Sequence, residues 1–203
     1  MKIINCEQGT DEWFYARLGK PSASIFSTIC TTKGKPTTGA TRESLINKYV
    51  AEIISGDKQQ SYSNAAIERG IELESSAADM FAFMNDVDLD QVGFILDDTE
   101  TFGCSPDRII HGEEIGLEIK CPLPHTHVKY LIESKLPAEY VLQVQGSMLV
   151  TGFKRWYFMS YCPNMPPLIL LIERDDELCS ALKFEIDSFN AEIKEKVSKI
   201  ESM

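Results

Sequence analysis

Residues 104–122 read CSPDRIIHGEEIGLEIKCP and place charged side chains inside what otherwise looks like a pair of short strands. The apolar runs RII and GLEIKC are separated by a polar turn, which is the pattern of a hairpin. In the second run the strand period of two puts Glu118 and Lys120 on one face and Leu117 and Ile119 on the other. The sheet must therefore accommodate a carboxylate and an ammonium among apolar neighbours.

Asp107 is separated from Glu118 by ten residues and lies at the end of the preceding run. Two carboxylates that meet at a few ångströms repel each other and raise each other's pKa, unless a cation lies between them. Mg²⁺ prefers oxygen ligands, and a lysine beside it orients a metal-bound water or counters the charge of a phosphate. Asp107, Glu118 and Lys120 together favour attack of water on a phosphodiester. The alternative is a surface hairpin whose glutamate and lysine pair across water.

The composition is that of a globular protein of 203 residues. The longest apolar run, PPLILLI near residue 170, is far too short to span a bilayer. The N-terminus MKIINCEQG has no apolar segment typical of a secretory signal. Six scattered cysteines without a CxxC pair indicate free thiols and argue against a zinc ribbon or a cysteine-held iron–sulfur cluster. We therefore expect a cytoplasmic protein.

Acidic residues are concentrated in one part of the chain. The formal net charge is −11, and residues 61–118 contribute two Lys or Arg against fourteen Asp or Glu. Such a balance is at first unfavourable for a nucleic-acid partner. Solvated surface explains most of the acidity, and a subset gathered around a divalent cation explains the rest. A chain that encloses DNA needs positive charge on its inner wall alone.

Periodicity predicts a single domain of the α/β (α+β) class over residues 1–203. One amphipathic helix is expected in TRESLINKYVAEIISG, with Leu45, Tyr49, Ile53 and Ile54 on its apolar face. Strands are expected in QVGFILD, FGCSPD, RII and GLEIKC, and again in KRWYFMSYC and PPLILLIER. There is no internal repeat and no linker long enough to divide the chain. The predicted architecture is a central mixed β-sheet flanked by helices.

SPD followed after ten residues by EIK resembles the PD-(D/E)xK nuclease motif. The wider pattern is similar to the lambda-exonuclease family, the YqaJ-type viral recombinases. The blocks that carry the likeness extend over most of the chain and are EQGTDEWFYARLG with SAS after it, ERGIELE, CSPD, GLEIKCP, YVLQVQGSM and WYFMSYCPNM…IER. Blocks in this order are far more specific than the tripeptide EIK alone.

The resemblance implies a restriction-endonuclease-like core and a defined activity. Members of the family use Mg²⁺ to digest double-stranded DNA from the 5′ end, releasing 5′-mononucleotides and leaving a 3′ single strand. The likeness implies that Asp107, Glu118, Glu74 and the backbone carbonyl of Ile119 are metal ligands, and that Lys120 positions the nucleophilic water. Two Mg²⁺ ions are expected, with Mn²⁺ as a possible substitute.

For two of the implied site residues, a residue of the same type lies two positions away and could take the same role. Glu74 matches the family's helix carboxylate, but it also reads as a surface glutamate, and Glu72 lies two residues away. Gln143 matches the family glutamine over the site, whereas Gln145 has apolar neighbours at helical spacing and is expected to face the sheet. Gly146 stands where the related pattern often has an aromatic residue.

The resemblance further implies that Arg17, Ser24 and Ser105 bind the terminal 5′-phosphate of DNA. A guanidinium makes bidentate, charge-assisted bonds to phosphate oxygens, and hydroxyls complete the shell. The competing interpretation of Arg17 is a surface salt bridge with Asp11 or Glu12. For Ser24 it is capping at the start of a helix.

Ile67 matches an apolar residue that wedges between the strands at the duplex end, with core packing as an equal alternative. His125 and His127 in PHTHVK suggest a metal site at first sight. Two imidazoles at this spacing point in different directions from a helix, so both are predicted to be surface residues.

The family forms toroidal trimers around DNA and works beside a single-strand annealing protein in phage-type recombination. The resemblance therefore implies double-stranded DNA ends, a homotrimer and such a protein as partners, and a phage or prophage gene in a bacterial cell. A structure-selective endonuclease of the same fold is one alternative, although residues for a 5′-phosphate argue against it. A non-catalytic DNA-binding or recombinase-docking module is another, although it should lack a carboxylate or the lysine. The remotest is a metal-binding protein unrelated to DNA.

Overall fold

Runs of helices and runs of strands follow one another along the chain in the computed structural model, which describes residues 1–57 and 65–203, with side chains of residues 65–67 left out. The helices are α1 (Asp11–Arg17), the 3₁₀ helix η1 (Ala23–Thr28), α2 (Ala40–Ser55), α3 (Ala65–Asn85), α4 (Pro124–Glu133), α5 (Ala138–Thr151) and α6 (Asp176–Glu201). The strands are β1 (Lys2–Ile4), β2 (Leu89–Asp90), β3 (Phe94–Leu96), β4 (Gly103–Cys104), β5 (Arg108–Ile110), β6 (Ile115–Lys120), β7 (Arg155–Ser160) and β8 (Leu168–Glu173).

The strands form two sheets. The larger has the order β2-β5-β6-β7-β8, in which β6 and β7 run parallel and the other neighbours run antiparallel. This confirms the predicted mixed sheet. A smaller antiparallel sheet, β1-β3-β4, lies beside it. The sequence did not predict its first strand, because β1 is short and half exposed and its pairing with β3 is a long-range contact.

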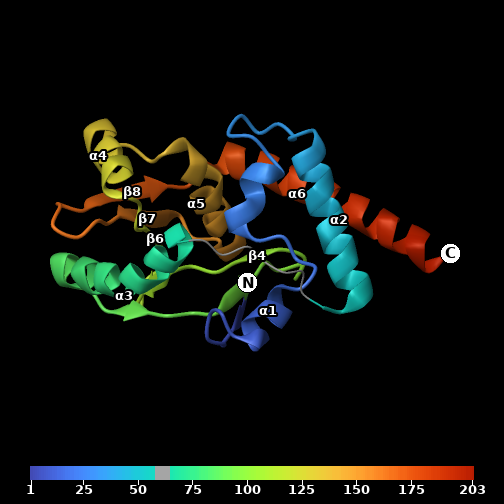
Figure 1. Ribbon diagram of the computed structural model, residues 1–203, viewed down its shortest axis with the longest axis horizontal. Helices are drawn as coiled ribbons and strands as arrows, with labels where there is room; N and C mark the ends of the chain where they lie inside the picture. The colour runs from blue at the N-terminus through green and yellow to red at the C-terminus, as the bar shows by residue number, and fades with distance from the viewer. Residues whose placement is uncertain (58–64) are drawn as a thin grey trace.

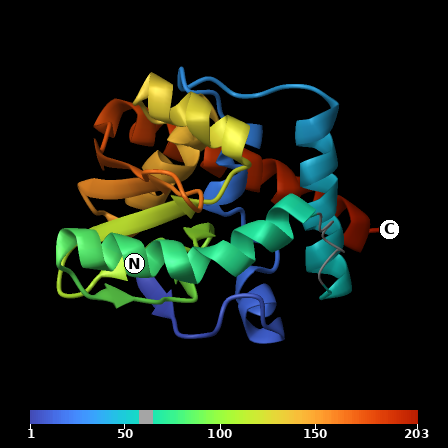
Figure 2. The ribbon, with the colours of Figure 1, turned by 60° about the vertical axis from the view of Figure 1, so that its left-hand side comes forward.

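Helices cover both faces of the larger sheet. α3 packs along one face, where Ala77, Ala78 and Phe81 meet the apolar side of β6. α5 packs on the other face, and η1, α2 and α6 lie behind it (Figures 1 and 2). Ile115, Leu117 and Ile119 of β6 belong to the core on the α3 side. The predicted alternation along β6 is therefore confirmed, and Glu118 and Lys120 face α5.

Glycine allows two close approaches in this core. A Cβ at Gly116 would lie 2.3 Å from the ring of Trp156, and one at Gly146 would lie 2.3 Å from the ring of Phe26. Gly146 thus lets η1 pack directly on α5. An aromatic side chain at this position would collide with the ring of Phe26.

The expected apolar face of α2 was partly wrong. Ile46, Tyr49 and Val50 are buried against η1 and α6, whereas Ile53 and Ile54 are 42% and 45% exposed. The buried residues follow the i, i+3, i+4 rule, but the stripe is rotated relative to the predicted one. Among the described residues, no helix combines the length and apolarity needed to cross a membrane.

Candidate active site

The hairpin of β5 and β6 brings two carboxylates together. The strands pair with Arg108 opposite Leu117, so the next opposed positions are Asp107 and Glu118. The backbone N–H of Ile119 donates a hydrogen bond of 2.5 Å to Oδ2 of Asp107. Register, rather than proximity along the chain, therefore explains how carboxylates ten residues apart share one site.

Glu118 is almost fully buried and has two donors on one oxygen. Its Oε1 lies 2.5 Å from Nζ of Lys120 in a salt bridge and accepts a hydrogen bond of 2.5 Å from Nε2 of Gln143 on α5. Nζ of Lys120 also lies 5.3 Å from the ring centroid of Tyr140. A buried carboxylate requires such partners, and here they come from β6 itself and from the helix that covers it.

Electrostatics at the site are unfavourable for a second negative charge. Burial and the charge of Glu118 raise the pKa of Asp107 well above its usual range, although Lys120 opposes the shift. Burial lowers the pKa of Lys120, but the carboxylates of Glu118 and Asp107 outweigh it and raise that pKa. Burial, with Asp107 and Glu74, raises the pKa of Cys121 to about 11, so this thiol is no nucleophile at neutral pH.

A third carboxylate approaches from α3. Oε1 of Glu74 lies 2.8 Å from a guanidinium nitrogen of Arg108, which also donates a 2.5 Å hydrogen bond to the carbonyl of Asp107. Glu72 is exposed to solvent and Glu74 is half-buried. Arg108, which the sequence interpretation did not use, thus ties the helix carboxylate to the hairpin.

Glu74, Asp107 and Lys120 border a cavity of about 470 Å³ between α3 and the C-terminal end of β6. The residues that line it are Arg69, Gly70, Ile71, Glu74, Asp107, Ile119, Lys120, Cys121, Pro122, Leu123 and Tyr140. Its floor is charged, and its rim includes apolar side chains. The cavity is open enough to admit a ligand larger than an ion.

The donor set fits Mg²⁺. Asp107, Glu118 and Glu74 supply hard oxygen atoms, and burial together with the charge of Glu118 raises the pKa of Asp107. Among the described side chains, no three from His, Cys, Asp or Glu form a ready-made ligand group. Mg²⁺ typically binds one or two carboxylates and keeps several waters. This donor set therefore suits Mg²⁺ better than a metal that requires an all-protein shell.

Arg17 stands in a second polar cluster. Its guanidinium donates a 2.8 Å hydrogen bond to Oγ of Ser22, which lies 3.3 Å from Oγ of Ser24. The guanidinium carbon is 3.9 Å from the ring centroid of Trp13. Burial lowers the pKa of Arg17, while Tyr49, Glu52 and Cys104 act against the shift. A side chain so stacked has a fixed guanidinium plane.

Trp13 joins this cluster to the hairpin. Its indole Nε1 donates hydrogen bonds of 2.9 Å to Oγ of Ser105 and 3.1 Å to the carbonyl of Gly93. Arg17, Ser24 and Ser105 are thereby linked through Trp13 and Ser22. Neither linker was identified as functional in the sequence, although both lie inside the blocks WFYAR and SAS. Ser22 makes no side-chain capping bond to η1.

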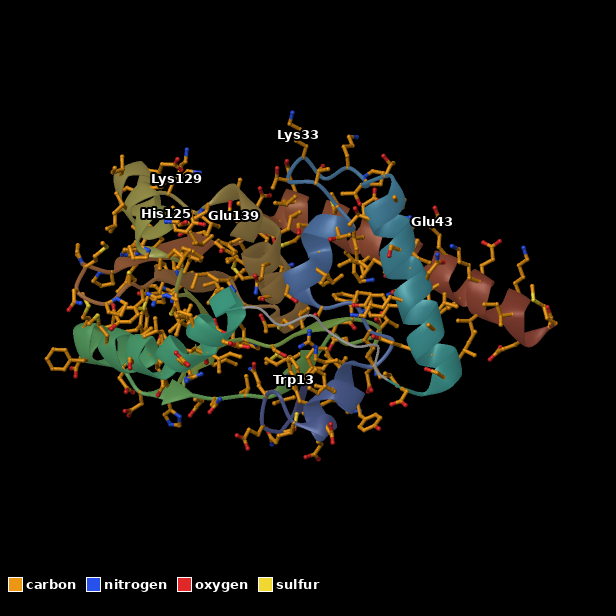
Figure 3. All side chains as sticks on the ribbon, viewed as in Figure 1. Trp13, Lys33, Glu43, His125, Lys129 and Glu139 are labelled. Atoms are coloured by element: carbon orange, nitrogen blue, oxygen red, sulfur yellow. The ribbon has the colours of Figure 1, made fainter. Side chains whose placement is uncertain are left out.

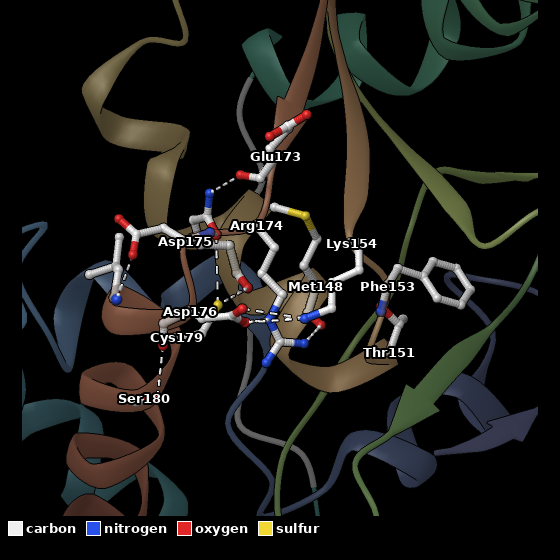
Figure 4. A network of polar contacts seen from close by, with 12 residues as sticks. Met148, Thr151, Phe153, Lys154, Glu173, Arg174, Asp175, Asp176, Cys179 and Ser180 are labelled. Atoms are coloured by element: carbon white, nitrogen blue, oxygen red, sulfur yellow. Dashed lines mark hydrogen bonds and ion pairs between the residues drawn. The ribbon is translucent and has the colours of Figure 1, made fainter.

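The two glutamines of α5 enter different surroundings. Gln145 is buried, donates a 2.9 Å hydrogen bond to the carbonyl of Glu173, and accepts one of 2.9 Å from the N–H of Asp175 (Figure 4). It thus holds the connection between β8 and α6. Gln143 alone of the pair contacts Glu118.

One histidine prediction was wrong. His127 is fully buried, with Nδ1 2.7 Å from Oγ of Ser160 and Nε2 3.0 Å from the carbonyl of Pro166. Helical periodicity turns it towards β7, where the sheet supplies polar partners. His125 is exposed, as predicted (Figure 3). Ile67 belongs to the backbone of α3, but its side chain lies outside the described part of the chain.

Comparison with known proteins finds a matching family and similar solved structures. Residues 12–154 match the family of YqaJ-like viral recombinase domains. Two solved structures of the alkaline exonuclease LHK-Exo from Laribacter hongkongensis, one in complex with dAMP, are 32% identical, with a TM-score of 0.86 over 95% of this chain and 97% of theirs.

A phage-related exonuclease from Haemophilus somnus 129PT has a TM-score of 0.72 over 89% of this chain and 96% of its own, at 16% identity, and shares the fold. None of the curated proteins compared with the chain matches it. The fold and the matched family agree with the resemblance found in the sequence. The chain therefore belongs to the YqaJ-like viral recombinase domain family.

Proposed function

We propose that the chain is a Mg²⁺-dependent 5′→3′ exonuclease that acts on double-stranded DNA. It would release 5′-mononucleotides and leave a 3′ single-stranded overhang for phage-type recombination. The observation that carries the proposal is the set of Asp107, Glu118 and Lys120, in which Glu118 is buried and the other two line an open cavity. Membership of a viral recombinase family and the likeness to an alkaline exonuclease support the same reaction.

The residues for the metal are the carboxylates of Asp107, Glu118 and Glu74 and the backbone carbonyl of Ile119. When bound, Mg²⁺ supplies Lewis-acid polarisation of the phosphodiester and a more acidic water. Burial and the charge of Glu118 raise the pKa of Asp107, and a cation held between the two carboxylates would lower it. Mn²⁺, which accepts the same oxygen ligands, is expected to substitute.

Lys120 orients the attacking water through its ammonium, which the protein holds at Glu118. Gln143 donates to the same Oε1 of Glu118 and so holds the orientation of its carboxylate. Tyr140 closes the α5 side of the site beside Lys120. The chain thus supplies a preorganised polar environment at the point where negative charge develops.

The 5′ direction rests on the cluster of Arg17, Ser24 and Ser105. Guanidinium and hydroxyl groups are suited to a terminal phosphate, and Trp13 connects the cluster to the hairpin that carries Asp107. An enzyme that cuts internal bonds has no need of such an anchor. Ile67 remains the proposed wedge at the duplex end.

The test uses linear duplex DNA, with and without a 5′-phosphate, and the Lys120→Ala protein. We expect mononucleotides from the wild type in Mg²⁺, faster release from the phosphorylated end, and no release by Lys120→Ala. Equal rates on both ends would remove the anchor and keep the nuclease. Cleavage of a covalently closed circle would show the endonuclease instead, and DNA binding without any cleavage would show the docking module.

We also propose a homotrimer that encloses DNA and works with a single-strand annealing protein in a phage- or prophage-bearing cell. Family membership supports both partners. Large apolar side chains exposed on three helices, Phe83 (89%), Ile132 (79%) and Phe184 (70%), are compatible with covered surfaces. The mass measured by light scattering, and co-purification with the annealing protein, test these two assignments separately.

A further inference from the structure

The cavity beside Lys120 has room for more than a metal ion. Its volume of about 470 Å³ lies within the range of about 300–1,000 Å³ found for small-molecule sites. Ile71 and Leu123 are exposed apolar side chains on its wall, and Tyr140 adds an aromatic ring. A surface of this kind suits a sugar and a base next to a charged floor.

Of the two basic residues that line the cavity and the nearby Arg108, all but Arg69 have an anionic partner among the described residues. Lys120 is paired with Glu118, and Arg108 is paired with Glu74. Arg69, which lines the cavity from the first half of α3, is different. Among the described residues its side chain has no carboxylate partner.

The contacts of Arg69 are weak. One terminal guanidinium nitrogen lies 3.8 Å from Sγ of Cys162, and the buried Nε has no hydrogen-bond partner within the described chain. An arginine is always charged, and a buried charge without a partner costs free energy. Among the described residues, the guanidinium of Arg69 therefore has no anionic partner, although Arg69 lines the cavity.

We propose that Arg69 binds a phosphate oxygen of the terminal nucleotide in the strand being cut. A guanidinium fork recognises phosphate through parallel charge-assisted bonds. Arg69 on α3 and Lys120 on β6 line the same cavity, so one nucleotide contacts both. The inference rests on the proposed nuclease function and adds a substrate-binding residue to it.

The role of Arg69 is tested first by binding, without catalysis. Isothermal titration calorimetry in Mg²⁺ measures the affinity of the wild type, Arg69→Lys and Arg69→Gln for dAMP and for deoxyadenosine, which lacks the phosphate. A hydrogen bond between charged groups predicts that Arg69→Gln lowers the affinity for dAMP about tenfold or more. Deoxyadenosine should bind all three proteins equally weakly. The dAMP affinity of Arg69→Lys should lie between those of the wild type and Arg69→Gln, because lysine keeps the charge and lacks the planar guanidinium fork.

The matched control is Arg155→Gln, an exposed arginine at the start of β7, at the opposite end of the strand pairing from Lys120. It should bind dAMP as the wild type does. Thermal unfolding of every variant excludes a folding defect. In steady-state digestion of linear duplex DNA, Arg69→Gln should raise KM more than it lowers kcat.

Equal dAMP affinity of Arg69→Gln and the wild type, or no dAMP binding by the wild type, would overturn the inference. An equal loss of affinity for deoxyadenosine would also overturn it, because the phosphate would then be irrelevant. If dAMP binding depends on Arg69 but the wild type digests no DNA, the phosphate site stands and the proposed nuclease function fails. The two ideas are thereby separated.

Discussion

Gln143 and Gln145 lie two residues apart on α5, and their side chains enter two different polar regions. Around Gln145, amide and carbonyl groups meet complementary backbone partners at 2.9 Å, and Arg174 donates a 3.0 Å hydrogen bond to the carbonyl of Met148 (Figure 4). Around Gln143, Glu118 lies opposite Asp107, whose pKa is strongly raised by burial, and Asp107 and Glu74 line a cavity. The first region has its partners within the chain, and the second places two opposed carboxylates beside an open cavity.

The difference teaches how to separate structural from functional polar groups. A satisfied network such as that of Gln145 lowers the free energy of the folded chain by itself. Two opposed carboxylates raise the free energy of the folded chain unless a cation lies between them, so their presence indicates a role other than stability. The predictions below alter one region at a time.

The largest effect is expected at Lys120. Lys120→Ala removes the ammonium that orients water and partners Glu118, and we expect a loss of DNA digestion of about 10³-fold. Lys129→Ala on the exposed surface of α4 is the matched control (Figure 3) and should keep the wild-type rate. Timed mononucleotide release in Mg²⁺ measures both. A fully active Lys120→Ala protein would disprove the proposed site.

Substitution of the two glutamines should affect different properties, stability for Gln145 and the rate of DNA digestion for Gln143. Gln145→Ala leaves the backbone groups of Glu173 and Asp175 without partners, which should lower the free energy of unfolding by about 1–3 kcal/mol and leave the rate on DNA unchanged below the unfolding temperature. Gln143→Ala should slow digestion about 10–100-fold, the usual cost of losing a group that orients a metal ligand. Its stability should change little. If both variants lose stability and digestion rate to the same extent, the proposed difference between the two polar regions is wrong.

Ionisation of Asp107 should lower the stability of the folded protein, whereas an aspartate with a lowered folded pKa contributes stability when it is ionised. Because its folded pKa is raised above the ordinary value of 3.8, its contribution to stability is fully present below that value and is lost as the pH rises through the folded pKa. Asp107→Asn, which keeps an acceptor for the N–H of Ile119, should therefore raise the unfolding temperature of the metal-free protein at neutral pH. Mg²⁺ should stabilise the wild type and not the variant.

Calorimetric scans between pH 3 and 8, with and without Mg²⁺, measure this behaviour. DNA digestion by Asp107→Asn serves as the second readout and should be lost. An unfolding temperature of Asp107→Asn below that of the wild type at neutral pH would show that Asp107 is a structural carboxylate.

A smaller effect is expected at the Arg17 cluster. Arg17→Gln removes a charge-assisted contact to the end phosphate, so the preference for phosphorylated over unphosphorylated ends should fall about tenfold. The rate on unphosphorylated ends should stay close to that of the wild type. Arg155→Gln is again the control. An unchanged preference in Arg17→Gln would assign Arg17 to packing against Trp13.

The smallest effect is expected for an exposed ion pair between α2 and α6. Arg42 contacts both carboxylate oxygens of Glu192, at 2.8 and 2.5 Å, and this hydrogen bonding lowers the pKa of Glu192. The stabilisation is present above the unfolded pKa and disappears as the pH falls, which is opposite in sign to Asp107. Because Glu192 is 42% exposed, Glu192→Gln should cost less than about 1 kcal/mol. Urea unfolding at pH 7 and pH 3 measures it.

Local patterns predicted the elements that build the site. The period of two in GLEIKC placed Glu118 and Lys120 on one face of β6, and apolar neighbours at helical spacing turned Gln145 away from it. The burial of His127 was missed, because a residue inside an amphipathic helix reveals its polar partners only when Ser160 and Pro166 are placed. The same holds for Ser22 and Trp13, which a buried Arg17 recruits.

By itself, the sequence determined the mixed sheet, the paired carboxylates with their lysine, and the family, because strand alternation and motif spacing are properties of the chain order. The tertiary structure alone decided that Arg108 would pair with Glu74 and that Arg69 would line the cavity without a carboxylate partner among the described residues. Both depend on how α3 crosses the end of β6. The packing of a helix on a sheet is set by the whole buried surface, which no short stretch of sequence contains.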